Sequence, residues 1–271
     1  MPIWADPARG ERVRLLADDD MTLLGMFVAP PAARPTAADL RAVPGADLDR
    51  FARVAQRDLP GVRVTTGPDE AAALVAVGAT HDRTLVHMVR ARLQEDPPPL
   101  RWAAPHLPAG VELVGADTAD ENVLAAAQQL AFGPGHPDHL ATAEAQEAGL
   151  LHSLLVGELL GPLYADASAL AVGENGSVLA SLLATRWEGI GEEWPGGPWV
   201  VDLFAVPGAP LLLGRSLLAR AVAVCALDGH DAVGLTVTAT NRARRLYERL
   251  GFVDAFSRVS LDLPGRWAEG P

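Results

Sequence analysis

The residues best suited to chemistry lie in one short segment, Asn241-Arg-Ala-Arg-Arg-Leu-Tyr-Glu-Arg-Leu-Gly-Phe252. If this segment is a helix, Asn241 occupies the N-cap, where its side-chain oxygen is available to backbone donors or to a ligand. Tyr247 then points from the flank of the helix toward the strand ends. One face is basic and consists of Arg242, Arg245 and Arg249. The pattern suits an anionic ligand beside a phenol, or alternatively an ordinary amphipathic helix with a solvated arginine face and a packed tyrosine.

The composition excludes several other chemistries. Arginine supplies all 22 basic residues, so the chain has no lysine for a Schiff base, a general base or a P-loop. The single cysteine, Cys225, excludes intramolecular disulfides and is expected in the core. No Gly-x-Ser-x-Gly elbow is present, and Gly189-Ile-Gly191 precedes no helix. The pair in His136-Pro-Asp-His139 lies in a predicted loop without further ligands, so we expect no metal site.

The net charge of −12 is distributed unevenly along the chain. Residues 1–109 are nearly neutral, whereas residues 110–213 hold 14 acidic residues and one arginine, and residues 214–258 hold seven arginines and four acidic residues. Nucleic acid is excluded as a partner because the chain lacks a broad basic surface. The distribution favours an anionic cofactor near residues 214–258 and a cationic substrate near residues 110–213, unless the acidic loops serve only solubility.

The elements that must position these residues lie mostly after a proline-rich segment, residues 96–109, which we interpret as a stiff extended linker. It separates a small α/β domain (residues 1–95) from a larger domain (residues 110–265). In the larger domain Thr118 and Glu121 form a capping-box pattern, and Asn175-Gly176 predicts a hairpin turn. Strands are expected at 111–115, 167–173, 177–186, 199–206, 233–240 and 253–263, and helices at about 121–132, 142–160, 214–227 and 241–251. This order predicts an α/β fold with a mixed sheet (α+β), in which antiparallel strands lead to a parallel β-α-β unit.

The first domain has weaker patterns, with strands expected at 22–28, 62–66 and 81–93 and helices at 46–57 and 69–77. Its last helix, glycine and strand parallel the end of the chain. When the two stretches are aligned on Gly78 and Gly251, Leu74 falls opposite Tyr247. The first domain is therefore a degenerate half-repeat without the polar groups, or the two stretches are unrelated αβ turns.

The run from Trp199 to Phe252 resembles the core of the GNAT superfamily of acyl-CoA-dependent N-acetyltransferases. The Asn-x-Ala-x-x-Leu-Tyr-x-x-Leu-Gly-Phe arrangement after a strand is a signature of that family, and the element order agrees over residues 110–263, more than half of the chain. The resemblance implies a GNAT-like fold with a smaller N-terminal α/β domain. It also implies transfer of an acetyl group from acetyl-CoA to a primary amine of a small molecule or peptide by direct attack.

The resemblance assigns roles to individual residues. The strand ending at Phe204, Ala205 and Val206 would pair its backbone with the pantetheine arm. Gly214, Arg215 and Ser216 would open the helix whose amides receive the pyrophosphate. Asn241 would contact the cofactor, and Arg245 would contribute from the basic face. Tyr247 would protonate the departing CoA thiolate.

The pyrophosphate loop departs from the family pattern Gln/Arg-x-x-Gly-x-Gly/Ala. The corresponding stretch, Ala209-Pro-Leu-Leu-Leu-Gly214, keeps only the last glycine, and Pro210 lacks a backbone donor. Phosphate binding would then depend on helix-end amides, Arg215 and the basic face. The alternative is a catalytically silent GNAT-like module that binds a ligand or a partner.

The transfer also needs a base for the acceptor amine. Asp202 is the leading candidate, with Glu188, Glu192 and Glu193 as alternatives, each of which could equally be a solvated acid. The tryptophans of the same region line an acceptor pocket or cover the core: Trp187, Trp194 and Trp199. The acceptor is expected to be cationic.

The N-terminus has no basic region followed by an apolar region, so we expect no signal peptide. The most apolar stretch, residues 150–163, is too short to cross a bilayer. We therefore expect a cytoplasmic protein without a membrane partner, and the sequence leaves a homodimer open.

Overall fold

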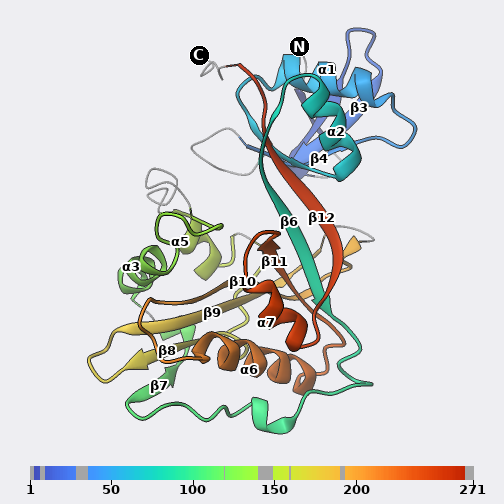
Figure 1. Cartoon of the computed structure of the whole chain (residues 1–271). Helices are drawn as coiled ribbons and strands as arrows, with labels where there is room; N and C mark the ends of the chain where they lie inside the picture. Colours follow the sequence, from blue (N-terminus) through green and yellow to red (C-terminus); the bar gives the residue numbers. More distant parts are fainter. Residues whose placement is uncertain are drawn as a thin grey trace. The chain divides into compact units, whose positions relative to one another are not determined.

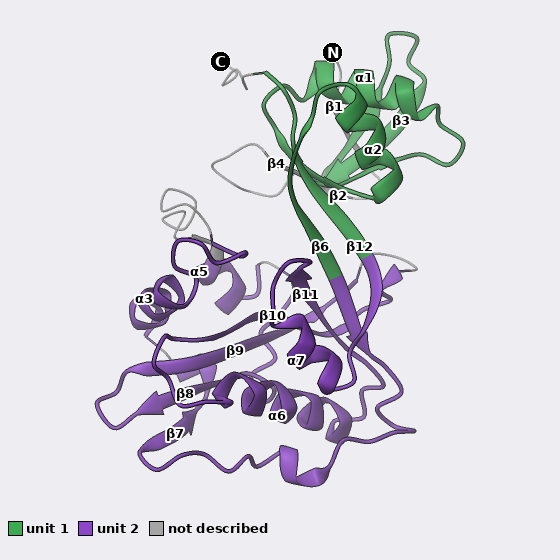
Figure 2. Cartoon of the chain, viewed as in Figure 1, with its two compact units in different colours: residues 1–86, 257–271 green, residues 87–256 purple. Residues whose placement is uncertain are grey.

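The computed structural model describes residues 3–6, 10–28, 36–118, 120–139, 149–158, 160–189 and 193–265 (Figure 1). The chain forms two compact units, residues 1–86 with 257–271 and residues 87–256, coloured separately in Figure 2. Strands β6 (Thr80–Arg90) and β12 (Val253–Asp262) contribute residues to both. The predicted linker falls inside the second unit, where the 3₁₀ helix η1 (Leu100–Trp102) bends it and lies against helix α6 (Leu213–Leu227).

The first unit, called unit 1, has strands in the order β1-β2-β3-β4-β5-β12-β6. Its core consists of residues from helix α2 and from α1, together with alternate residues of the strands, among them Phe51, Leu74 and Val64. Strand β5 buries every second residue, the pattern of a strand with one face on a core. The remaining elements of unit 1 are β1 (Ile3–Asp6), β2 (Gly10–Ala17), β3 (Leu23–Val28), β4 (Thr36–Ala42), α1 (Leu48–Asp58), β5 (Arg63–Thr66) and α2 (Pro68–Ala76).

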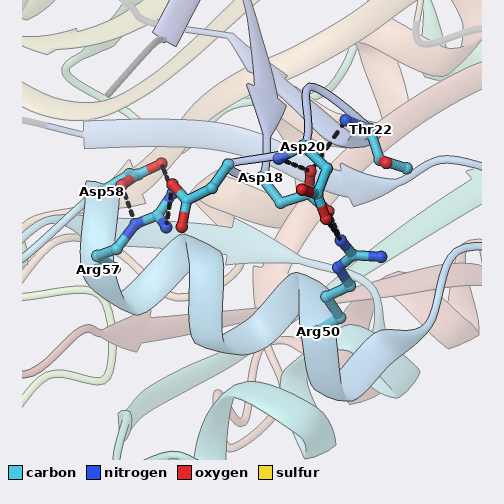
Figure 3. Close-up of polar contacts among 7 residues, drawn as sticks. Asp18, Asp20, Thr22, Arg50, Arg57 and Asp58 are labelled. Carbon is cyan, nitrogen blue, oxygen red and sulfur yellow. Dashed lines mark hydrogen bonds and ion pairs between the residues drawn. The ribbon is translucent and has the colours of Figure 1, made fainter.

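An acidic turn between β2 and β3 is paired with helix α1 (Figure 3). Asp18, which is buried, accepts hydrogen bonds from the backbone N–H groups of Asp20 and Thr22, at 3.0 and 2.9 Å. Arg50 of α1 forms an ion pair with Asp18, and Arg57 pairs with both Asp19 and Asp58 in the same network. Each aspartate of the turn thus has a partner in unit 1, and we assign the turn a structural role.

The second unit, called unit 2, has strands in the order β12-β6-β11-β10-β9-β8-β7. Strands β10 and β11 run parallel, and β7 to β10 pair antiparallel. The fold class predicted from the sequence, α/β with a mixed sheet, is confirmed. The remaining elements of unit 2 are β7 (Val111–Val114), η2 (Ala116–Thr118), α3 (Glu121–Ala131), α5 (Gly149–Leu155), β8 (Ala169–Gly173), β9 (Val178–Trp187), β10 (Gly197–Ala205), β11 (Val233–Thr238) and α7 (Arg244–Arg249).

The local predictions for unit 2 have mixed outcomes. The β8–β9 hairpin at Asn175-Gly176 is confirmed, with Asn175 Oδ1 accepting from Ser177 N at 3.1 Å. The capping box is wrong, because Asp120 caps α3 by accepting from Asn122 N at 2.8 Å, whereas the Thr118 hydroxyl donates to Gly115 O. The helix predicted at 142–160 is described only from residue 149, and α5 ends at Leu155; residues 140–148 and 159 lie outside the described residues.

The two units repeat one succession of elements, a strand, helix, parallel strand, helix and strand. It reads β4-α1-β5-α2-β6 in unit 1 and β10-α6-β11-α7-β12 in unit 2, and two antiparallel strands precede it each time. Between the corresponding strands unit 2 has α3 and α5, whereas in unit 1 the residues between β1 and β2 lie outside the described residues. The half-repeat stays a prediction.

Candidate active site

Strands β10 and β11 part after their first paired residues. They pair at Trp199 with Gly234 and at Val200 with Leu235, and residues 193–265, described without a gap, contain no further pairs between them. On its other side β10 stays paired with β9 as far as Ala205, with a bulge at Val201. The backbone of β10 beyond the bulge therefore faces β11 without a ladder and can bind an extended ligand.

The strand residues predicted to hold the cofactor lie on this part of β10. The Phe204 side chain is buried in the unit 2 core and makes an edge contact with Phe132, with ring centroids 5.9 Å apart. Successive residues of a strand direct their backbone groups to opposite edges, and Val206 N–H points to β9, so Ala205 presents its N–H and C=O on the β11 side whereas those of Phe204 face β9. Val206 follows the strand, and its N–H already donates to Leu179 O at 2.9 Å.

Helix α6 begins with an open N-terminus. Its N-cap, Leu212, has left-handed backbone angles (φ 72°) and makes no side-chain capping bond. The first intrahelical bond runs from Ser216 N to Leu212 O at 2.8 Å, so the N–H groups of Leu213, Gly214 and Arg215 precede the ladder. Arg215 is exposed. Free amides, the helix dipole and a guanidinium together favour an anion here.

Unit 1 differs at both equivalent places. Strands β4 and β5 stay paired up to Thr66, the last residue of β5, so they do not part. The N-terminus of α1 is capped by Asp47, whose side chain accepts from Arg50 N at 3.0 Å. A carboxylate therefore occupies the position where α6 offers free amides. Leu74 of α2, fully buried, takes the position that Tyr247 has in α7.

Asp202 follows the bulge of β10 and is buried. Its Oδ2 accepts a hydrogen bond from Gln128 Nε2 of α3 at 3.0 Å. Burial raises the pKa of Asp202 to about 7; the hydrogen bonds from Gln128 and from Leu203 N–H oppose this rise, and the charge of Asp138 adds to it. A carboxyl group with this pKa can accept a proton near neutral pH, as a general base must.

Tyr247 lies in α7, and its side chain is buried. Burial and then the negative charges of Asp138 and Asp202 raise its pKa, so the phenol keeps its proton. No residue that the structure describes forms a hydrogen bond with its hydroxyl. Tyr164, the other tyrosine, instead donates to Asp228 and stacks under Arg186 at 4.4 Å. Of the two phenols, Tyr247 is the one whose proton is not committed to a described acceptor.

Asn241 uses both ends of its side chain within the protein. Its Oδ1 accepts from Ala243 N at 2.8 Å, and its Nδ2 donates to Asp138 Oδ2 at 2.6 Å. The predicted N-cap position is wrong, because α7 begins at Arg244 after the N-cap Ala243, and the bond from Ala243 N–H to Asn241 Oδ1 lies in the turn before the helix. One Nδ2 proton and one Oδ1 lone pair remain for the predicted contact with a cofactor.

Arg242, Arg245 and Arg249 are exposed, but only Arg245 and Arg249 lie on α7, because the helix begins at Arg244. Arg244 pairs with Asp254 at 2.7 Å. The opposite side of the segment is buried at Tyr247 and Leu250, whereas Ala243 and Leu246 are only half-buried.

The remaining base candidates are less suited to the role. Glu188 and Glu193 are exposed, and Glu192 lies outside the described residues. The tryptophans form a buried cluster. The rings of Trp187 and Trp194 contact the Trp199 ring edge-on, with ring centroids 4.9 and 5.0 Å from its centroid. A Cβ on Gly234 would lie 2.0 Å from the Trp199 ring, so glycine is required there. This cluster favours the core-covering interpretation of the tryptophans.

Two further expectations concern other kinds of site. The part of the chain that the structure describes contains no cluster of three metal-ligating side chains. Cys225 is buried in α6, and burial raises the pKa of its thiol to about 12, so it is no nucleophile. Within the described ranges, no helix has the length and apolarity needed to span a bilayer.

Comparisons with known proteins agree with this arrangement of strands and helices. No family model matches the sequence, and no curated protein does. Among solved structures, a GCN5-related N-acetyltransferase from Sphaerobacter thermophilus matches with a TM-score of 0.62 at 18% identity, covering 97% of this chain and 84% of that one. One from Kribbella flavida gives 0.54 at 17%, covering 90% and 89%.

A tandem GNAT protein from the clavulanic acid biosynthesis pathway matches with a TM-score of 0.54 at 15% identity, covering 92% of this chain and 81% of that one. Identities this low carry the fold alone. The likeness extends over nearly the whole chain rather than over residues 110–263 only. The chain therefore has the fold of the GCN5-related N-acetyltransferases.

Proposed function

We propose that the protein is an N-acetyltransferase that moves an acetyl group from acetyl-CoA to a primary amine. The observation that carries this proposal is the parting of β10 and β11 next to the uncapped N-terminus of α6. Asp202 lies on the same stretch of β10, and its charge and that of Asp138 both act on Tyr247. An electrophile bound between the strands would thus have a base and an acid near it.

The donor fits the groups that this part of unit 2 offers. The amides of a pantetheine arm can pair with the β10 backbone at Ala205, whose N–H and C=O face the open side, as an added strand would. A pyrophosphate can accept from the N–H groups of Gly214 and Arg215, with the Arg215 guanidinium and the basic face as counter-charges. Asn241 and Arg245 are proposed as further contacts. The bound donor supplies an activated acetyl thioester.

The chain's own residues would handle two protons. The Asp202 carboxylate takes a proton from the acceptor ammonium, directly or through a water, and leaves a neutral amine. The amine nitrogen forms a bond to the acetyl carbon, the carbon–sulfur bond breaks, and the nitrogen releases its second proton to solvent. Tyr247 Oη donates its proton to the departing sulfur and regains one from solvent. The products are an acetamide, a free thiol and a proton.

For the acceptor we propose a cationic small molecule or peptide amine. Residues 110–213 carry 14 acidic residues against Arg186 alone, and this stretch includes α3 and the loop that follows it. Such a surface attracts a protonated amine, and salt screens the attraction. The cationic acceptor and a homodimer are both proposed.

Titration with acetyl-CoA and with CoA tests the proposal directly. At about 100 times its Kd either ligand should stabilise the folded protein by ~2.7 kcal/mol, measurable as a thermal shift and by calorimetry. Release of free thiol from acetyl-CoA should then depend on an added amine. Absence of binding by both ligands would overturn the proposal.

Replacing Leu212 tests the role of the α6 N-terminus. Leu212→Asp puts a carboxylate at the N-cap, as Asp47 does in α1, and should weaken acetyl-CoA binding by roughly tenfold, ~1.4 kcal/mol. Leu212→Asn is the matched control, because Asn has the same shape, accepts left-handed backbone angles and carries no charge. Equal affinities of the two variants in calorimetry would place the phosphates elsewhere.

The second candidate is a module that binds a ligand without catalysing transfer. The observation that favours it is Asn241, whose side chain is already bonded at both ends within the protein. This candidate predicts binding of CoA without thiol release for any amine, so the same two measurements separate the two functions.

A further inference from the structure

The loop after α3 is bonded to both sides of the candidate site through Asp138. One carboxylate oxygen accepts from the hydroxyl of Thr238, the last residue of β11, and the other accepts from Asn241 Nδ2 at 2.6 Å. Thr238 is buried, and Asp138 is half-buried. Asp138 thus joins the end of β11 to Asn241, which lies just before α7. These two partners lie 100 and 103 residues after Asp138 in the sequence.

The contact with Asn241 continues into the first turn of α7. With its Nδ2 held by Asp138, Asn241 presents Oδ1 to Ala243 N at 2.8 Å, and its own carbonyl accepts from Arg244 N. The carbonyl of Ala243 then accepts from Tyr247 N at 3.2 Å. A rotation of the Asn241 amide would break the first bond of this series, which orders the turn leading into the helix that carries Tyr247.

The same segment also contacts the proposed base. Gln128, on the last turns of α3, donates to Asp202 Oδ2 at 3.0 Å, and the loop that leaves this helix bears Asp138. Residues 121–139 therefore contact Asp202 at one end and the start of α7 at the other. No other described segment has side chains that form hydrogen bonds with both Asp202 and the residues at the start of α7.

The charged groups around Asp138 and Asp202 come from few elements. Asp202 faces Gln128 of α3 and lies within electrostatic reach of Asp138 and of Tyr247. Asp138 faces Thr238, Asn241 and His136, whose Nδ1 lies 3.8 Å from Asp138 Oδ2 and accepts from Asp138 N–H. His139 is directed away, with Nδ1 2.6 Å from Phe132 O. Asp138 is thus the carboxylate that acts on both proposed proton carriers.

We propose that Asp138 is a positioning residue for acetyl transfer, which holds the Tyr247 turn in place through Asn241 and sets the charge beside Asp202. The inference rests on the proposed function and assigns to Asp138 no contact with substrate. Removal of its charge should make Asp202 ionise at lower pH, because a neighbouring negative charge disfavours a second one. Removal of its acceptor oxygen should disorder the orientation of Asn241.

Asp138→Asn makes both changes with almost no change in volume. It removes the charge and leaves one acceptor oxygen for the two donors that Asp138 binds, Thr238 Oγ1 and Asn241 Nδ2, and it should lower kcat at least tenfold with less than a threefold change in the KM for acetyl-CoA. The swap Asp138→Asn/Asn241→Asp restores a donor facing an acceptor and leaves Thr238 its acceptor and Ala243 N–H its partner. It should recover kcat relative to Asp138→Asn at saturating acetyl-CoA, with a raised KM for acetyl-CoA because residue 241 is a proposed contact of the anionic cofactor. Asp117→Asn, an exposed carboxylate on η2, is the control for loss of one charge and should leave kcat unchanged.

A measurement without turnover completes the test. Carboxyl ¹³C shifts of the free protein report the Asp202 titration, which should move to lower pH in Asp138→Asn and stay unchanged in Asp117→Asn. The acid limb of kcat/KM should move in the same direction. If Asp138→Asn turns over at the wild-type rate, or if the Asp202 titration does not move, the proposal is overturned. A wild-type protein without turnover would instead contradict the proposed function, and the titration would still decide the coupling to Asp202.

Discussion

Tyr247→Phe is expected to lower kcat by roughly 10²–10⁴-fold, the range for loss of a positioned general acid. The free energy of unfolding should hardly change, because the hydroxyl has no hydrogen-bond partner among the described residues and its loss leaves no orphaned group. Acetyl-CoA affinity should stay close to wild type, since the ring remains in place. Steady-state kinetics with a thiol-release readout and denaturant unfolding measure both quantities.

Tyr164→Phe is the matched control, because the chain has only one other tyrosine. Its hydroxyl donates to Asp228, so its loss should cost about 1 kcal/mol of stability and leave kcat unchanged. The two variants therefore have opposite expected outcomes, one in rate and one in stability. A Tyr247→Phe enzyme with wild-type kcat would remove the acid role from this residue.

Asp202→Asn is expected to abolish most of the turnover and at the same time to stabilise the protein above neutral pH. In the folded protein the pKa of Asp202 is raised from 3.8 to about 7, chiefly by burial. Between these values the folded state binds a proton that the unfolded state releases, so wild-type stability falls as the pH rises through this range. At about 1.4 kcal/mol for each pKa unit, the variant gains up to ~4 kcal/mol above pH 7 and little near pH 4.

Denaturant unfolding at several pH values checks this sign, and the kcat/KM profile of the wild type should lose activity on the acid side near pH 7. Asp82→Asn in unit 1 is the control. Burial opposes ionisation of Asp82, but the hydrogen bond from Arg83 and the charges of Arg83 and Arg63 together lower its pKa. That variant should therefore lose stability at neutral pH. Equal pH dependence in Asp202→Asn and wild type would contradict the proposed ionisation of Asp202.

The sequence predicts much of unit 2 because its signals are local. Hydrophobic periodicity, the Asn-Gly turn and the Tyr247 signature each depend on residues within about a dozen positions, and all lead to elements that the structure contains. In unit 1 strands β1, β2 and β4 were missed. Strand β1 has only four residues, and β2 and β4 carry charged residues between their few apolar ones, so these segments become strands through pairing with neighbours.

The candidate site was predicted less completely than the fold. Asp202 and Tyr247 can be proposed as site residues from their places in a strand and a helix. Asp138 follows His136 and Pro137 and precedes His139, so its sequence context is that of an ordinary acidic residue in a loop. Its partners are 100 and 103 residues away in the sequence. Only the folded chain brings them together, so no local pattern could identify Asp138.

The assignment of residues 257–262 to unit 1 has a consequence for how the chain is made. Strand β12 pairs with β5 through Val259 to Asp262, and Arg63 forms paired hydrogen bonds with Asp262 across 199 residues. During synthesis the sheet of unit 1 cannot be completed until residue 262 has left the ribosome. Until then the edge of β5 is unpaired and open to other strands. The sheet of unit 1 is therefore completed only after residues 87–256 have been made, although β1 to β5 are made before them.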